Sequence, residues 1–186
     1  MTRVPMAAGI LLAGLLLFAC SKRDGLVVTG DKVGPISVAT PFDAAAVAAL
    51  FPQLEVSAGI SSALEPGAHV IRVSDNGKTV LELYPTGDGA RVASVLILSD
   101  IVRDENGVHI GSAYRDIFPP AKPTGCMAGA TEKRGRIYCP QPNSNRIIYE
   151  MQGLPPAPDG QVPPPEALAD WRVTAILWDG DDAAIN

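Results

Sequence analysis

The sequence predicts an α+β fold: an antiparallel β-sheet meander with two or three short helices packed on it. Three observations lead to this prediction. Short segments of alternating or continuous apolar residues, typical of strands, recur between residues 34 and 178. Tight-turn sequences containing Gly separate most of these segments, so neighbouring strands are expected to pair in an antiparallel way. Segments with the apolar spacing of a helix are short.

The first helix is expected within residues 34–52, "GPISVATPFDAAAVAALFP", directly after a short strand. Thr40 is a favourable N-cap residue, and Pro41 would occupy the first helical position. The apolar residues that follow lie at helical spacing and define one face: Phe42, Ala45, Ala46, Ala49 and Leu50. Val47 and Phe51 lie off this face, so the helix is expected to be covered on more than one side. Pro52 is expected to end the helix, because proline breaks helical hydrogen bonding.

A β-hairpin is expected over residues 69–85, "HVIRVSDNGKTVLELYP". A three-residue loop, residues 75–77, pairs Ile71 with Leu81 and separates the side chains cleanly. Ile71, Val73, Leu81 and Leu83 then share one face, and Arg72 and Glu82 share the other. Since a slip of one residue moves every side chain to the opposite face, this separation favours the three-residue loop.

The remaining elements follow in order. Residues 91–99 are apolar on both faces and are expected to form a central strand. Residues 106–120 are expected to form a turn, a short strand and a short helix, an outline that repeats residues 34–52 and raises the question of an internal duplication. The later strands are expected near residues 136–139, 145–151 and 172–178, with a proline-rich crossing at 154–171.

The first 19 residues have the features of a secretory signal peptide. Arg3 provides a basic start, and the apolar run from Met6 to Ala19 is shorter than the roughly 20 residues that span a bilayer. The segment Leu17-Phe18-Ala19-Cys20 resembles the bacterial lipobox. This resemblance implies cleavage before Cys20 and acylation of that cysteine. Similar lipoproteins of Gram-negative bacteria that lack Asp after the cysteine are sent to the outer membrane, and here Ser21 follows it.

The sequence therefore divides into four parts: a signal peptide (1–19), the lipidated Cys20 with a tether (20–33), a single α+β domain (34–178) and an acidic tail (179–186). The chain carries 15 basic and 20 acidic side chains, a net charge of −5. This balance argues against binding to nucleic acid, which requires a dense basic surface. The expected location is the periplasmic face of the outer membrane, with the lipid of Cys20 as the membrane contact.

Cys126 and Cys139 are expected to form a structural disulfide. Their spacing does not match a zinc or redox motif, and an oxidising compartment favours a covalent bond between two such cysteines. The loop between them contains the basic cluster "EKRGR". Lys133, Arg134 and Arg136 are therefore candidates for a partner contact, although a charged hairpin tip is often only a solvated surface.

Catalytic residues are not indicated by the sequence, and neither a metal site nor a cofactor site is expected. His109, Ser112 and Asp116 supply the residue types of a hydrolase triad, but the nucleophile-elbow motif is missing and Ser112 is better explained as a helix cap. Asp104 and Glu105 lie in an expected turn, where solvated charge is the ordinary explanation.

The order of elements from about Ile36 to Trp178 resembles an uncharacterised family of short bacterial envelope lipoproteins. The segments that carry the resemblance are "TPFDAAAVAALFP", "VIRVSDNGKTVLELYP" and "GVHIGSAYRDIF", together with Cys126 and Cys139. The expected function is that of a non-catalytic outer-membrane lipoprotein that binds another envelope protein or a wall component. The alternatives are an inhibitor of a wall-degrading hydrolase and, third, a cell-wall enzyme.

Replacement of Cys20 by Ser is expected to release the protein from the membrane fraction or to leave it as an unprocessed precursor, because the acyl chains would lose their attachment site. Cell fractionation and metabolic labelling with palmitate measure the two effects. Membrane association and acyl labelling that both survive the substitution would contradict the lipoprotein prediction.

Overall fold

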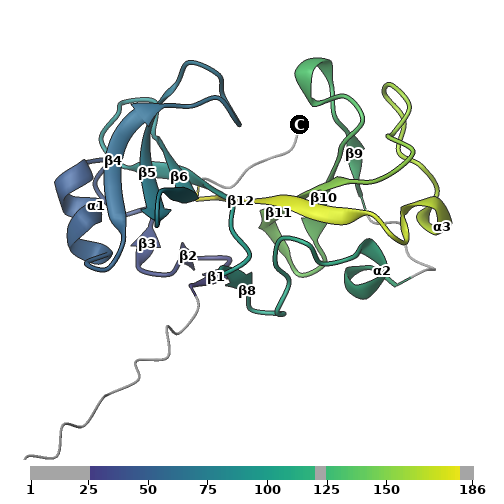
Figure 1. Cartoon of the computed structure of the whole chain (residues 1–186), viewed down its shortest axis with the longest axis horizontal. Helices are drawn as coiled ribbons and strands as arrows, with labels where there is room; N and C mark the ends of the chain where they lie inside the picture. The colour runs from purple at the N-terminus through teal and green to yellow at the C-terminus, as the bar shows by residue number, and fades with distance from the viewer. Residues whose placement is uncertain (1–25, 120–124, 181–186) are drawn as a thin grey trace, which may run out of the picture.

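The computed structural model describes residues 26–119 and 125–180. Within these residues the chain forms an eight-stranded antiparallel sheet, a second sheet of four short strands and three short α-helices (Figure 1). The described part is thus mostly antiparallel β-sheet with short helices, as predicted, and the helices are a minor component. The predicted signal peptide and Cys20 lie outside the described residues. None of the described helices has the length and apolar character needed to cross a membrane.

The large sheet consists of two halves, and in each half the strands follow one another in chain order from the edge to the centre. Its strands, in spatial order, are β4 (Glu55–Ile60), β5 (His69–Asp75), β6 (Lys78–Pro85), β7 (Val92–Ile97), β12 (Arg172–Asp179), β11 (Ser144–Gln152), β10 (Ile137–Gln141) and β9 (Met127–Ala128). Each half is a meander of four strands, and β7 pairs with β12 at the seam. Helix α1 (Ala44–Leu50) precedes the first half, and helix α2 (Tyr114–Ile117) precedes the second. A short helix thus precedes each meander, as in the repeated outline of the sequence, but the strand expected before the second helix does not form at residues 107–110.

The small sheet contains the N-terminal part of the described chain. Its order is β3 (Ile36–Ser37), β2 (Lys32–Val33), β1 (Val27–Thr29) and β8 (Arg103–Asp104), with β1 parallel to β8. Val28 and Val33 are fully buried, so the predicted tether is wrong for residues 27–33, which belong to the fold. Strands β1 and β2 each bury a single valine, which is too few to produce a recognisable apolar pattern. At the other end, Asp179 completes β12, and the predicted tail beyond residue 180 lies outside the described residues.

The core lies between the small sheet, the helices and one face of the large sheet (Figure 1). The large sheet contributes alternate residues of its strands, among them Ile71, Leu83, Ile97, Ile147, Tyr149, Ile176 and Trp178. Val47 of α1, Tyr114 of α2 and Leu168 of α3 (Pro165–Leu168) pack against them. Trp178 is fully buried, and its indole Nε1–H donates to the carbonyl of Gly30 at 3.2 Å, which ties the seam to the small sheet.

The hairpin of β5 and β6 has the predicted faces but a different loop. Asp75 pairs with Lys78, so the turn has two residues, Asn76 and Gly77, both with positive φ (51° and 74°). A β-bulge next to Val73 shifts the register, so that Val73 pairs with Leu81 and Ile71 with Leu83. Without a bulge, only a three-residue loop would place Ile71, Val73, Leu81 and Leu83 on one face. The bulge adds one residue to β6, so the two-residue turn gives the same separation of faces.

The cap of α1 also differs from the prediction. Asp43, not Thr40, is the N-cap, and its Oδ1 accepts a hydrogen bond from the Ala46 N–H at 2.8 Å. The Thr40 hydroxyl instead accepts from the Ser37 N–H at 3.0 Å. Both residue types favour N-cap positions, and the turn before the helix decides which of them is used.

The predicted disulfide between Cys126 and Cys139 is present. Cys139 lies on β10 and is fully buried, whereas Cys126 directly precedes the two-residue edge strand β9. The bond therefore fixes the end of the sheet at which backbone pairing is shortest, and it closes the loop that contains Lys133 and Arg136.

Replacement of Cys126 and Cys139 by Ala together is expected to lower the free energy of unfolding by roughly 3 kcal/mol, because the cross-link restricts the unfolded chain. Urea denaturation under non-reducing conditions measures the change. In the native protein, an alkylating reagent should label neither cysteine before reduction. Rapid labelling without reductant would show that the bond does not form in the protein.

Candidate functional site

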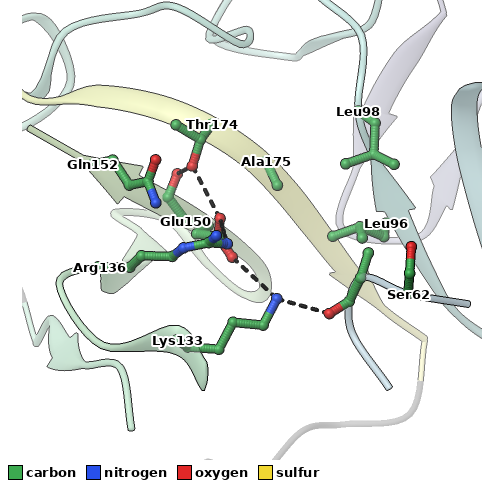
Figure 2. Close-up of a pocket in the computed structure, with 10 residues that line it drawn as sticks. Ser62, Leu96, Leu98, Lys133, Arg136, Glu150, Gln152, Thr174 and Ala175 are labelled. Atoms are coloured by element: carbon green, nitrogen blue, oxygen red, sulfur yellow. Dashed lines mark hydrogen bonds and ion pairs between the residues drawn. The ribbon is translucent and has the colours of Figure 1, made fainter. Parts of the chain in front are cut away.

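A pocket of about 370 Å³ lies on the face of the large sheet opposite the core. Leu96 and Leu98 from β7 and its C-terminal end, together with Ala175 from β12, give it an apolar wall at the seam between the two halves. The opposite wall is polar, and Figure 2 shows its side chains grouped around Glu150. The full lining consists of Ser62, Ala63, Leu96, Leu98, Lys133, Arg136, Glu150, Gln152, Thr174 and Ala175.

Two loops, one from each half, form the rims of the pocket. The loop of residues 61–68 connects β4 with β5, and the loop of residues 129–136, with the 3-10 helix η1 (Thr131–Lys133), connects β9 with β10. They meet where the ammonium group of Lys133 donates to the carbonyl of Ala63 at 2.8 Å (Figure 2). This hydrogen bond joins residues 70 positions apart and spans the seam on the pocket side.

Glu150 is the centre of the polar wall. Its carboxylate accepts hydrogen bonds from Arg136 Nη1 at 2.6 Å, from the Tyr138 hydroxyl at 2.8 Å and from the Thr174 hydroxyl at 3.0 Å, and Lys133 Nζ lies 3.9 Å away. The Glu150 side chain is only 11% exposed, so these partners offset the cost of removing its charge from water. Burial, followed by the hydrogen bond to Glu150, raises the pKa of Tyr138 above its usual value.

The first half of the sheet holds a similar carboxylate, Glu82 on β6. It accepts from Arg72 Nε at 2.9 Å, from the Tyr84 hydroxyl at 2.9 Å and from the Ser61 hydroxyl at 3.1 Å. Burial is the main cause that raises the pKa of Tyr84. Gly59 leaves room for the Arg72 guanidinium, since an added Cβ would lie 2.3 Å from it.

Glu82 and Glu150 occupy corresponding positions, each on the third strand of its half. Glu82 lies between Arg72 and Leu96 in the sheet register, and Glu150 lies between Tyr138 and Ala175. The two carboxylates differ in what covers them. The 61–68 loop covers Glu82 through Ser61, whereas Glu150 lines the pocket.

The three basic residues singled out in the sequence have different surroundings. Lys133 and Arg136 are 26% and 30% exposed, and both face Glu150 in the pocket. The alternative of a solvated tip therefore does not describe Lys133 and Arg136. Arg134 is 65% exposed and lies 3.7 Å from the carboxylate of Asp159. Two of the three cations thus face the pocket and one is exposed, and their role as a partner contact stays a prediction.

The residues of the hypothetical triad are only partly brought together. The Ser112 hydroxyl lies 2.9 Å from His109 Nδ1 and also accepts from the His109 backbone N–H at 3.0 Å, which makes a local turn. Ser112 does not cap α2, whose N-cap is Ala113, and residues 107–110 do not form the predicted strand. Asp116 is exposed in the first turn of α2. The described residues contain no group of three or more potential metal ligands.

Asp104 also differs from its expected surroundings, because it is buried. Its carboxylate accepts from the backbone N–H groups of Asn106 and Val108, at 2.9 and 2.8 Å, and from the side chains of Gln141 and Tyr149. Burial and the hydrogen bond to Asp104 raise the pKa of Tyr149. These contacts fix the turn after β8 to β10 and β11, so Asp104 has a structural role.

The family model described as "Protein of unknown function (DUF1131)" matches residues 18–180, which include both halves of the sheet and the whole pocket. The chain belongs to this family. The resemblance to a family without an assigned function is thereby confirmed, whereas the lipid anchor stays a prediction.

Relatives of this DUF1131 chain agree with the fold. "Uncharacterized protein YfeY" of Escherichia coli (strain K12) is 26% identical over 157 residues, which cover 81% of this chain and 78% of the relative. The crystal structure of the uncharacterized protein YfeY from Escherichia coli has a TM-score of 0.62 to this chain at 22% identity, and the match covers 83% of this chain and 99% of that one. At this level of identity the likeness shows a shared fold.

Glu150, Thr174 and the apolar wall of the pocket were not predicted from the sequence. A signal for Glu150 was present, because "YEM" places a single carboxylate in an otherwise apolar strand, as "LEL" does for Glu82. A charged residue at the centre of a buried strand requires a partner. The identity of the partners depends on which strands pair, which a single strand does not reveal.

Replacement of Gly129 by Ala is expected to disturb the loop that positions Lys133, because the added Cβ would lie 2.1 Å from the Lys133 backbone oxygen. We expect the free energy of unfolding to fall by about 1–3 kcal/mol. Gly87→Ala is the matched control, since nothing lies within 4 Å of its added Cβ, and its effect should stay below about 0.5 kcal/mol. Equal effects of the two substitutions in urea denaturation would contradict the proposed packing of the 129–136 loop.

Proposed function

We propose that this DUF1131 protein is a non-catalytic, lipid-anchored accessory module of the bacterial outer membrane that binds another envelope component through the pocket face of its large sheet. The observation that carries the proposal is the position of the pocket relative to the entry of the chain. Strand β1 packs on the core side of the large sheet, and the pocket lies on the opposite side. Figure 1 shows β1 and β2 below the large sheet and the 61–68 and 129–136 loops above it.

A lipid on Cys20 would hold the core side toward the membrane. Six residue steps separate Cys20 from Leu26, the first described residue, and an extended chain spans at most roughly 3.3–3.6 Å per step. The small sheet would therefore stay within roughly 20 Å of the lipid surface. The pocket face, on the far side of the large sheet, would be directed toward the aqueous space and its components.

The chemistry of the pocket supports binding. Its one carboxylate, Glu150, is fully engaged by hydrogen-bond donors, so it is held as a fixed charge. Lys133 and Arg136 are held by the same group, and the adjoining apolar wall offers surface to a ligand. Fixed polar groups next to apolar surface are typical of sites that orient a bound molecule.

A photo-crosslinking amino acid placed at Gln152, an exposed residue of the pocket lining, is expected to capture a discrete envelope component in cells. The same amino acid at Lys32, which is exposed on β2 of the small sheet, is the matched control and should not capture that component. Immunoblotting of the membrane fraction measures both products.

If the partner binds in the pocket, the crosslinked product at position 152 should disappear when Ala175 is replaced by Phe, because the larger side chain fills the pocket. Folding of that variant is checked by thermal denaturation. Identical products from positions 152 and 32, or a product at 152 that the Ala175→Phe substitution leaves unchanged, would contradict a binding role of this face.

A further inference from the structure

The charges that line the pocket do not cancel. Lys133 and Arg136 contribute two positive charges, Glu150 contributes one negative charge, and the other lining residues are uncharged. All three charged side chains are largely withdrawn from solvent, at 26%, 30% and 11% exposed. An excess of one positive charge in such surroundings acts more strongly on a ligand than the same charge on an open surface.

The two cations retain capacity for hydrogen bonds. A guanidinium has five N–H groups, and the Arg136 side chain donates to Glu150. An ammonium has three, and Lys133 donates to Ala63 while it lies 3.9 Å from Glu150. A planar oxyanion at the pocket could therefore receive charge-assisted hydrogen bonds from both residues without displacing Glu150.

The apolar wall indicates which kind of chemical group is attached to the anion. Leu96, which is 5% exposed, Leu98 and Ala175 form a surface beside the charged wall, as Figure 2 shows. A volume of about 370 Å³ lies at the lower end of ordinary ligand sites, which are about 300–1,000 Å³. The space suits one carboxylate attached to a short aliphatic group and does not suit a large polyanion.

We propose that the pocket binds an amphipathic monocarboxylate, whose carboxylate contacts Lys133 and Arg136 and whose aliphatic part packs on Leu96, Leu98 and Ala175. The inference rests on the proposed role of the pocket as the binding site of the protein. The same chemistry occurs in a free aliphatic acid and in the C-terminal residue of a polypeptide, and the experiment separates these sources.

The test is calorimetric titration of the full-length protein in detergent with two soluble probes, hexanoate and N-acetyl-leucine. Hexanamide and N-acetyl-leucinamide are the neutral controls, and they also report partition into the detergent. Each carboxylate that fits the pocket should bind at least about tenfold more tightly than its amide, since hydrogen bonds to charged groups contribute the difference. Binding of hexanoate alone identifies a free acid, and binding of N-acetyl-leucine alone identifies a chain terminus.

Two substitutions at the charged wall give effects of opposite sign. Lys133→Met keeps the aliphatic stem but removes the charge, and it should weaken carboxylate binding by about tenfold. Glu150→Gln keeps an oxygen acceptor for Arg136 but removes the opposing charge, and it should strengthen carboxylate binding several-fold. Neither substitution should change the response to the amides, and thermal denaturation verifies that both variants fold.

The inference is overturned if the native protein binds neither carboxylate more tightly than its amide, or if Lys133→Met binds them as the native protein does. Failure of the proposed function gives a different result. In that case the carboxylates bind, but the crosslinked product at position 152 is absent or insensitive to filling of the pocket. A pocket-dependent crosslink without carboxylate binding would leave the proposed function in place and remove the inference.

Discussion

The pairing of β7 with β12 is the constraint on which both the core and the pocket depend. Its register places Ile97 opposite Ile176 and Leu96 opposite Leu177. Ile97 and Ile176 face the core on one side of the sheet, while Leu96 and Ala175 face the pocket on the other. Since side chains alternate along a strand, a slip of one residue would exchange the two faces along the whole seam.

The polar side of the sheet is organised by two buried glutamates. Each lies on the third strand of its half, accepts from a tyrosine hydroxyl and pairs with an arginine, which compensates for the loss of solvent. The halves differ in what lies over the carboxylate. Ser61 of the 61–68 loop covers Glu82, whereas on the pocket side the carbonyl of Ala63 in the same loop accepts from Lys133. A repeated architecture therefore has one closed polar cluster and one that lines a pocket.

Three kinds of contact hold the pocket loops in place. The disulfide of Cys126 and Cys139 closes the 129–136 loop near its base, and close packing at Gly129 fixes its path against the Lys133 backbone. The hydrogen bond from Lys133 to Ala63 then joins this loop to the other half. Lys133 and Arg136 thus belong to a restrained loop, which reduces the conformational entropy that a ligand would have to remove.

Local patterns in the sequence determined the faces of the β5–β6 hairpin and the approximate positions of the long strands β7, β11 and β12. The alternation in residues 69–85 predicted that Ile71, Val73, Leu81 and Leu83 would face the core, and the two cysteines predicted their own bond. The tertiary structure decided everything that joins distant segments: the β7–β12 pairing, the burial of Val28 and Val33, and the contact of Lys133 with Glu150 and Ala63. A local pattern records only which face of a strand is apolar, whereas a pocket depends on which strands become neighbours, and that is set by the packing of the whole chain.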